Sequence, residues 1–278
     1  MTAPVTAFVL GGGGPEGASE VGMLRALVEA GIEPDLIVGT SVGAVNGAVY
    51  AAEPGPARVK RLEAVWSGLE ASGVFEGSLM TRVGTALRTR THIHSNEPLR
   101  RLLQDAVGDG PIEQMPVRFE CVAASIERAA EVWFSSGSIV TAVLASSAVP
   151  GLLPPIAYRG EHFLDGGLVD SVPVGRAVEL GADRIFILHG GRVEHPLAVP
   201  RQPWQVAAVA FEISRRHRLH RALADLPDSV AVHLLPAGTP APSPADWGRY
   251  LNYRAYGRAK DRIRLAYEAC AAYLEAMA

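Results

Sequence analysis

The apolar residues of this chain fall into short runs that are separated by segments of helical periodicity. Residues 5–10 and 36–38 are mostly apolar runs rich in branched side chains, which predicts two buried strands. Between them, apolar residues recur every three or four positions over residues 18–30, which predicts a helix that stops at a glycine. Residues 42–50 are small and apolar, as in a helix packed tightly against a sheet. Because crossovers between parallel strands are right-handed, this order of elements predicts a parallel sheet whose glycine-rich turns share one edge.

The same patterns continue through the rest of the chain. We expect further strands at residues 117–124, 130–134, 162–165, 184–189 and 229–235, and helices at 139–147, 174–180, 204–226 and 252–276. Residues 57–103 have a helical pattern interrupted by arginines and histidines, which indicates a helical cap inserted over the edge of the sheet, with its apolar positions facing the core. The sequence thus predicts an α/β fold in a single domain, with a core over 5–190, the cap over about 57–103 and a C-terminal helical extension over 203–278.

Charge and composition exclude some classes of function. The 278 residues carry a formal net charge of −3 and a pI of about 6.3, so nothing global indicates binding to nucleic acid. Cys121 and Cys270 form neither a metal-binding spacing nor a disulfide framework, which predicts a reducing compartment. The N-terminus lacks a charged leader, and the charge-free stretch 135–158 is interrupted by prolines, so we expect a soluble cytoplasmic protein without a membrane span.

Two arginine-rich segments bear on membrane contact. Apolar residues alternate with arginines between residues 79 and 101, which predicts weak, salt-sensitive, peripheral contact with an anionic membrane surface. The basic cluster at residues 215–221 falls in the long helix predicted at 204–226. We expect it mainly to form a solvated face, with contact with an anionic membrane as the alternative. The sequence gives no indication of the oligomeric state.

A glycine-flanked serine stands between the second strand and the second helix. Gly39-Thr40-Ser41-Val42-Gly43 fits the pattern G-x-S-x-G. A sharp strand-to-helix turn strains its central residue and leaves no room for Cβ atoms two positions to either side, where this chain has Gly39 and Gly43. The helix that follows would direct its free N–H groups and the positive end of its dipole at Ser41 Oγ. We therefore interpret Ser41 as a nucleophile on an elbow and not as a solvated serine in a tight turn.

The first strand ends in a glycine-rich segment at residues 12–17 that fits G-x-G-x-x-G. This pattern also occurs in dinucleotide-binding folds, but there an acidic residue should end the second strand, and Asp35 precedes it. Backbone N–H groups in a glycine-rich turn converge on one point, as the intermediate of an acyl transfer requires. With an elbow directly downstream, we favour an oxyanion loop over a nucleotide site.

A serine hydroxyl is a weak nucleophile until a base takes its proton. The chain order Ser41, Asp165, His189 is that of the α/β-hydrolase triad, and His189 follows a predicted strand. Asp165, in a turn with Gly166 and Gly167, could instead act directly on the serine. Sequence spacing leaves both the triad and the dyad open.

Three motifs, in order, resemble the patatin-like phospholipase family. The glycine loop up to Gly17, with the helix after it, resembles the family's oxyanion loop, and residues 39–43 match its nucleophile elbow. Asp165-Gly166-Gly167 matches the family's aspartate motif, with residues 145–151 before it and 172–174 after it. The resemblance covers residue 5 to about residue 189.

The resemblance implies a three-layer α/β/α fold with a mainly parallel central sheet and a Ser-Asp dyad. Ser41 would be the nucleophile and Asp165 the general base, and His189 would be structural. The oxyanion would be held by N–H groups of the loop glycines Gly12, Gly13 and Gly14. No metal or cofactor is implied. The implied function is a lipid acyl hydrolase that cleaves carboxyl esters of phospholipids or acylglycerols through an acyl-serine.

Two positions depart from the family's pattern. Glu16 stands where the family's loop normally carries arginine or lysine, and Ser171 stands where asparagine is usual. A carboxylate that faced the oxyanion would raise the barrier by about 2 kcal/mol. We therefore expect the Glu16 side chain to turn toward the N-terminus of the next helix or toward a basic partner such as Arg25. The departure at Glu16 also keeps open a non-catalytic lipid-binding or regulatory module as the alternative function.

Overall fold

The computed structural model describes residues 4–72, 91–191, 196–197, 199–238 and 258–277. The strands are β1 (Thr6–Leu10), β2 (Leu36–Thr40), β3 (Arg118–Ser125), β4 (Ala130–Phe134), β5 (Ile156–Tyr158), β6 (Glu161–Asp165), β7 (Arg184–Leu188) and β8 (Ala231–Leu234). The α-helices are α1 (Ala18–Glu29), α2 (Val42–Ala52), α3 (Pro56–Ser72), α5 (Glu97–Val107), α6 (Ile139–Ser146), α7 (Val174–Glu179), α8 (Pro203–Ala224) and α9 (Ala259–Met277). Short 3₁₀ turns occur at Gly14–Gly17, Ile112–Gln114 and Gly166–Leu168.

A mixed sheet with the strand order β5-β6-β3-β2-β1-β7-β8 forms the centre of the molecule, and β4 pairs with β3 beside this path. Five neighbouring strands of this order are parallel to one another, namely β3, β2, β1, β7 and β8. β4, β5 and β6 add antiparallel pairs on the β3 side. The mainly parallel sheet predicted from the sequence is confirmed. Because β1, β2 and β7 are parallel neighbours, the loops that follow them meet at one edge of the sheet.

Alternate residues of the central strands face opposite layers. In β1, Phe8 and Leu10 belong to the larger hydrophobic cluster on one face, whereas Ala7 and Val9 belong to a second cluster on the other face. β7 shows the same alternation. Parallel strands that are covered on both faces read as unbroken apolar runs in the sequence. This is why residues 5–10 predict a buried strand without a polar face.

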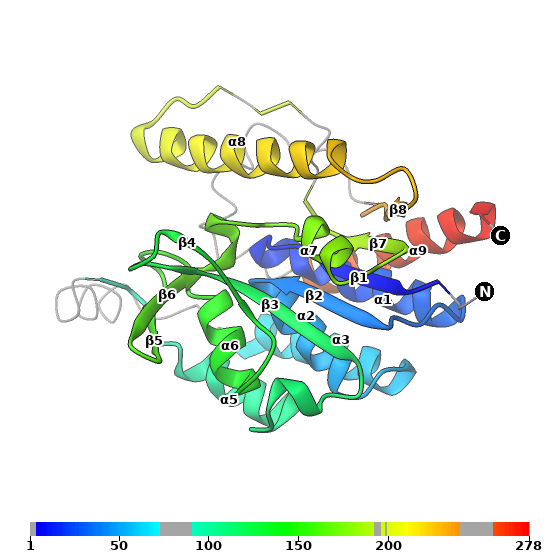
Figure 1. Cartoon of the computed structure of the whole chain (residues 1–278), viewed down its shortest axis with the longest axis horizontal. Helices are drawn as coiled ribbons and strands as arrows, with labels where there is room; N and C mark the ends of the chain where they lie inside the picture. The colour runs from blue at the N-terminus through cyan, green and yellow to red at the C-terminus, as the bar shows by residue number, and fades with distance from the viewer. Residues whose placement is uncertain (1–3, 73–90, 192–195, 198, 239–257, 278) are drawn as a thin grey trace.

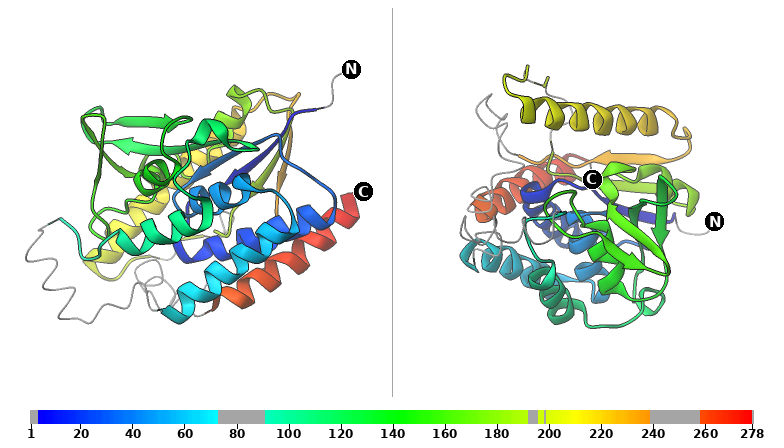
Figure 2. Two further views of the ribbon diagram at one scale, coloured as in Figure 1. Left: turned by 90° about the horizontal axis from the view of Figure 1, so that it is seen from below. Right: turned by 90° about the vertical axis from the view of Figure 1, so that its left-hand side faces the viewer.

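Helices cover both faces of this sheet, which gives the three-layer α/β/α arrangement (Figure 1). The larger cluster receives side chains from α1, α2, α3, α5, α6 and α9, and the second cluster receives them from α7 and α8. α1, α3 and α9 pack side by side, as the left panel of Figure 2 shows. The second helical layer is thinner, with α8 lying along the far side of α7 (Figure 1).

The described parts of the predicted cap belong to the larger helical layer. Val59, Leu62 and Trp66 of α3 and Leu103 of α5 are buried in the larger cluster, which confirms that these apolar positions face the core. Both helices pack on α2, so their described parts cover a face of the sheet, and the predicted position over its edge is wrong for them. Residues 73–90 of the predicted cap lie outside the described residues.

The C-terminal extension contributes to the core on both faces. β8 pairs with β7 and lengthens the sheet. Ile263, Ala266, Cys270 and Leu274 of α9 are buried in the larger cluster, and Leu219 of α8 is buried in the second. Residues 252–257 of the predicted C-terminal helix lie outside the described residues. The described parts of the segment after residue 203 are therefore built into the fold.

Candidate active site

Ser41 occupies a strained turn between β2 and α2. Its backbone has φ 54° and ψ −122°, although left-handed φ values are uncommon for residues other than glycine. The turn brings Gly43 so close to β1 that a Cβ atom there would overlap the carbonyl oxygen of Leu10. α2 starts directly after Ser41, which places the serine at the positive end of the helix dipole. These features are those of the strand-to-helix elbow predicted from the sequence.

The sheet register brings Asp165 level with Ser41. Thr40, the last residue of β2, pairs with Val122, and the next residue of β3, Ala123, pairs with Asp165 of β6. Ser41 Oγ donates a hydrogen bond of 2.6 Å to Asp165 Oδ2. The second oxygen, Oδ1, accepts one of 2.7 Å from the backbone N–H of Gly167. The hydroxyl and the carboxyl are thus held in contact from two different strands, with one carboxyl oxygen fixed by the backbone.

Burial changes the acidity of Asp165. The residue is 7% exposed, and burial raises the pKa of its carboxyl to about 6, against smaller lowering effects of the hydrogen bonds from Ser41 and Gly167. A group with this pKa is mostly ionised at pH 7 but binds a proton far more readily than an exposed aspartate. It can therefore accept a proton from a neighbouring hydroxyl and release it again.

Two further serines hold the backbone of Ser41. Its N–H donates to Ser146 Oγ at 2.9 Å, and its carbonyl oxygen accepts from Ser147 Oγ at 3.2 Å. Both serines stand at the end of α6, within the segment 145–151 that supports the resemblance, but the sequence assigned them no role. Their hydrogen bonds stabilise the strained turn and engage the Ser41 N–H.

The glycine loop lies against Ser41. A Cβ atom on Gly12 would be 3.4 Å from Ser41 Cβ. The Gly12 N–H donates to the carbonyl oxygen of Ser171 at 2.8 Å, so this N–H is engaged within the protein and is not directed at a substrate. For Gly13 and Gly14 the described residues offer no hydrogen-bond acceptor to the N–H group. Of the three glycines predicted for the oxyanion, Gly13 and Gly14 retain N–H groups that can serve.

His189 is turned away from the dyad. It is buried at the end of β7, and its Nε2 lies 3.2 Å from Nη1 of Arg215. A guanidinium only donates, so Nε2 must accept and the ring proton must sit on Nδ1. Burial and the charge of Arg215 lower the pKa of His189 to about 3, which keeps the ring neutral. The structure brings Ser41 together with Asp165 and places His189 against an arginine.

Arg215 is the largest difference from the sequence-based picture. The prediction that residues 215–221 form a solvated face is wrong for Arg215 and Leu219, which are 6% and 5% exposed. Arg215 forms a two-point ion pair with Glu212 and donates to the Gly12 carbonyl oxygen at 3.2 Å and to Ser171 Oγ at 3.1 Å. α8 lies across the active site, so Arg215 is one of the side chains on its buried face. A cluster of charged residues in a sequence does not reveal which of them faces inward.

Glu16 is paired with an arginine from the last helix. Its Oε1 accepts from Nη2 of Arg262 at 3.0 Å, and Nη1 of Arg262 donates to the Pro15 carbonyl oxygen at 3.3 Å. A basic partner for Glu16 is thus confirmed, but it is Arg262 and not Arg25, whose guanidinium bonds to Glu29. Ser171, the other departure from the family pattern, accepts from both Gly12 and Arg215 and so ties the loop to α8.

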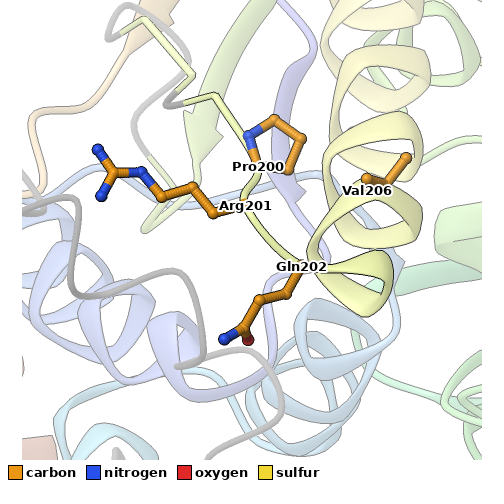
Figure 3. A pocket seen from close by; sticks show the side chains of 4 residues that line it. All are labelled: Pro200, Arg201, Gln202 and Val206. Carbon is orange, nitrogen blue, oxygen red and sulfur yellow. The ribbon is translucent and has the colours of Figure 1, made fainter.

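A hollow of about 520 Å³ opens at the start of α8, lined by Pro200, Arg201, Gln202 and Val206 (Figure 3). None of these residues touches the dyad in the described contacts. The hollow is nevertheless on the helix that reaches the site, because Arg215 lies nine positions after Val206 on α8, a distance of about 13 Å along the axis. The hollow therefore lies near the Ser41–Asp165 dyad and does not contain it.

Among the described residues, no cluster of three or more His, Cys, Asp or Glu side chains is arranged to hold a metal ion. No helix in the described ranges has both the length and the apolar character needed to cross a bilayer.

A sequence model described as patatin-like phospholipase matches residues 8–178, which include Ser41 and Asp165. The chain belongs to the patatin-like phospholipase family. The matched region of this patatin-like chain ends within α7, so β7, α8, β8 and α9 lie beyond it.

Two curated relatives are fungal lysophospholipases. Lysophospholipase nte1 of Aspergillus terreus is 36% identical over 187 residues, and lysophospholipase NTE1 of Coccidioides immitis is 36% identical over 191 residues. Each alignment covers 67% of this patatin-like chain but 12% of the relative, so the chain spans only a small part of their length. The solved structure of VipD from Legionella pneumophila has a TM-score of 0.42 and 16% identity over 95% of this chain and 67% of VipD, a similarity too distant to inform the site.

Proposed function

We propose that this protein is a serine-dependent lipid acyl hydrolase that cleaves carboxyl esters of phospholipids or acylglycerols. The observation that carries the proposal is the 2.6 Å hydrogen bond from Ser41 Oγ to Asp165 Oδ2 at the end of an elbow. Membership of the patatin-like phospholipase family and the lysophospholipase names of two relatives support the lipid ester as substrate.

The proposed reaction begins when Ser41 Oγ attacks the ester carbonyl carbon while Asp165 takes the hydroxyl proton. The carbonyl oxygen becomes an oxyanion, which the N–H groups of Gly13 and Gly14 stabilise together with the positive end of α2. Asp165 then gives its proton to the departing alkoxide, the C–O bond breaks, and an acyl-serine remains. In the second half Asp165 takes a proton from water, whose oxygen attacks the acyl carbon. The fatty acid leaves as Asp165 returns the proton to Ser41 Oγ.

The proposal is tested with a fluorophosphonate probe and with esters of short and long acyl chains. We expect the probe to label Ser41 and expect hydrolysis of the esters to disappear in Ser41→Ala. Ser95→Ala, an exposed serine next to α5, is the matched control and should retain both. Absence of labelling together with absence of Ser41-dependent cleavage would reject the hydrolase.

The non-catalytic lipid-binding module is the alternative, and its sequence support was Glu16. In the structure that carboxylate is paired with Arg262, which reduces its opposition to an oxyanion. Liposome binding that survives Ser41→Ala, with no turnover in the parent protein, would favour the module.

We further propose that the protein contacts an anionic membrane surface peripherally, through α8. Val206, Phe211 and Ile213 are 53%, 43% and 55% exposed, and they lie within two turns of one another on this helix. The only acid among the residues of α8 is Glu212, which pairs with Arg215 and Arg216. Arg218 and Arg221 follow on the same helix without an acidic residue of α8 left to balance them. Exposed apolar side chains next to unbalanced positive charge suit the surface of an anionic bilayer.

The earlier basis for membrane contact was the arginine-rich segment at residues 79–101. Residues 79–90 lie outside the described residues. Arg100 and Arg101, at the other end of that segment, are paired with Glu97 of their own helix. The membrane proposal therefore rests on α8.

A further inference from the structure

Two arginines from the C-terminal helices hold carbonyl oxygens of the glycine loop. Arg215 of α8 donates to the Gly12 carbonyl oxygen, and Arg262 of α9 donates to that of Pro15 and to the carboxylate of Glu16. Both side chains are buried, 6% exposed for Arg215 and 7% exposed for Arg262. Both residues lie beyond residue 178, where the family match ends.

The N–H groups of Arg215 are directed at protein groups, which leaves few of them for a ligand. Nε and Nη2 bond to the two oxygens of Glu212 at 2.8 Å each. Nη1 is directed at Gly12, Ser171 and His189 at 3.1 to 3.2 Å. A guanidinium has five N–H donors in a rigid plane, and protein groups take nearly all of them here. Arg215 is therefore unsuited to binding a phosphate headgroup, although it lies beside the site.

The Gly12 carbonyl is significant because of the peptide unit to which it belongs. The C=O of Gly12 and the N–H of Gly13 share one planar, trans peptide, so they point in opposite directions. An arginine that fixes the carbonyl on one side fixes the direction of the Gly13 N–H on the other. A charged donor on the carbonyl also polarises the amide, which strengthens the N–H as a donor.

We propose that Arg215 and Arg262 are positioning residues that hold the glycine loop in the geometry needed for the oxyanion. Glu212 belongs to the same group of residues because its ion pair orients Arg215. We call Glu212, Arg215 and Arg262 the loop brace. The part of the inference that concerns the oxyanion rests on the proposed hydrolase. Its consequence is that the active site extends beyond the family match and is completed by α8 and α9.

Hydrogen exchange tests the brace without relying on activity. The double variant Glu212→Gln, Arg215→Gln removes the two buried charges together, and the new amide at position 212 can still accept from Arg216, the partly exposed second partner of Glu212. We expect the hydrogen-bonded loop amides of Gly11, Gly12 and Glu16 to exchange at least about tenfold faster than in the parent, while amides of β1 and β2 keep their rates. Arg262→Met should have the same local effect. The control is Arg264→Met, an exposed arginine on α9 that pairs only with Glu268 in the described contacts, which should leave the loop unchanged.

Kinetics with a short, soluble ester tests the effect on chemistry. Loss of an aligned oxyanion donor should lower kcat by about tenfold to a hundredfold in the double variant and leave KM within about twofold. Arg215→Lys keeps the positive charge but cannot bond Glu212 at two points and reach Gly12 as well. The brace predicts little recovery in this variant, whereas a general effect of charge on the oxyanion would restore most of the rate.

The outcomes separate the brace from the hydrolase. Loop exchange equal to that of the Arg264→Met control would overturn the brace, and so would faster exchange spread evenly through the molecule, since that would show a general loss of stability. A full recovery in Arg215→Lys would overturn the positioning of the loop as the cause. A parent protein that neither cleaves esters nor reacts with the probe would reject the hydrolase, and the exchange comparison would still decide whether the brace holds the loop.

Discussion

Asp165 is subject to two opposing requirements. A base must be ionised before it can take a proton, and burial at the end of β6 favours the neutral form. Its hydrogen bonds from Ser41 and Gly167 act against burial and leave the pKa at about 6. The balance gives a group that is a stronger base than an exposed aspartate and that is still charged at neutral pH.

The first prediction is that kcat/KM for an uncharged ester rises with pH, with an apparent pKa near 6, and levels off above about 7. Asp170 has a pKa raised to about 6 as well, mainly by burial, so Asp170→Asn is the control and should keep this acidic limb. If Asp170→Asn shifts the apparent pKa of this limb, the assignment to Asp165 is contradicted.

Protonation of Asp165 affects folding stability in the opposite direction. The folded state binds the Asp165 proton more tightly than the unfolded chain does, so the contribution of this group to the free energy of unfolding falls as pH rises from about 4 to 6.

The second prediction compares the two candidate bases. Asp165→Asn should lower kcat/KM at least about a hundredfold in a folded protein, because the general base is lost. His189→Ala should cost less than about tenfold, since its Nε2 faces Arg215. Steady-state kinetics with circular dichroism to check folding makes the comparison. Activity abolished by His189→Ala alone would assign a triad.

The third prediction concerns the Glu16 carboxylate, whose negative charge is paired with Arg262. Glu16→Gln should change kcat/KM by less than about fivefold. It should slightly lower the melting temperature, because the buried guanidinium loses its charged partner. A gain above about tenfold that shrinks as salt is added would mean that the carboxylate opposes the reaction.

Residues on the loops after β2 and β6 could be predicted because their chemistry requires glycines at fixed positions around them. Ser41 and Asp165 each have such glycines beside them. Arg215 and Arg262 have no such flanking residues. Arg215 is one of four arginines on α8 and Arg262 is one of two on α9, and only the packing of each helix decides which one is buried. The same holds for Ser146 and Ser147, which matter through the turn they support.

At the scale of elements, α1 and α9 approach each other unusually closely. A Cβ atom on Gly22 would overlap the carbonyl oxygen of Ile263 and lie 2.8 Å from the N atom of Tyr267. The pair therefore packs backbone to backbone, with α3 beside it (Figure 2). This contact sets the position of Arg262 relative to the glycine loop.

The fourth prediction follows from that contact. Gly22→Ala should lower the free energy of unfolding by about 1–3 kcal/mol, since the helices must separate. Gly68→Ala, on an exposed part of α3 where a Cβ meets open space, should raise it by about 0.5–1 kcal/mol through helix propensity. Urea unfolding measures both. Equal effects of the two substitutions would mean that α1 and α9 do not pack as described.

Most elements were predictable, because a strand buried on both faces and an amphipathic helix leave distinct patterns. The run at 184–189 predicted β7, and the small residues at 139–147 predicted α6. The layer to which α3 and α5 belong was not predictable. An amphipathic helix has the same periodicity whether its apolar stripe meets a sheet face or a sheet edge, so only tertiary contacts distinguish them.

At the scale of the whole molecule, the two faces of the sheet differ in what they present to solvent. The larger layer holds most of the helices, whereas α8 lies over the other face (Figure 1). On α8 the apolar side chains of Val206, Phe211 and Ile213 are exposed. A formal net charge of −3 would repel an anionic membrane, so contact requires that the positive charge be concentrated on one side.

The fifth prediction tests that orientation. Val206→Asp with Ile213→Asp should weaken sedimentation with anionic vesicles at least about fivefold, because apolar insertion is lost and negative charge is added. Hydrolysis of a short, soluble ester should not change. Met277→Asp, which alters a similarly exposed apolar residue at the end of α9, is the control. Binding that resists high salt, or that is unaffected by the double substitution, would contradict a peripheral contact through α8.

The pairing of Glu16 with Arg262 joins residues that are 246 positions apart. During synthesis at about 5–20 residues per second, roughly 12–50 s pass between the appearance of the glycine loop and that of its second arginine. Ser41 is made early in this interval, before the loop beside it can be fixed. A nascent chain would thus carry its nucleophile beside a glycine loop that is not yet fixed, and the proposed ester cleavage would reach its full rate only after α9 has docked on α1.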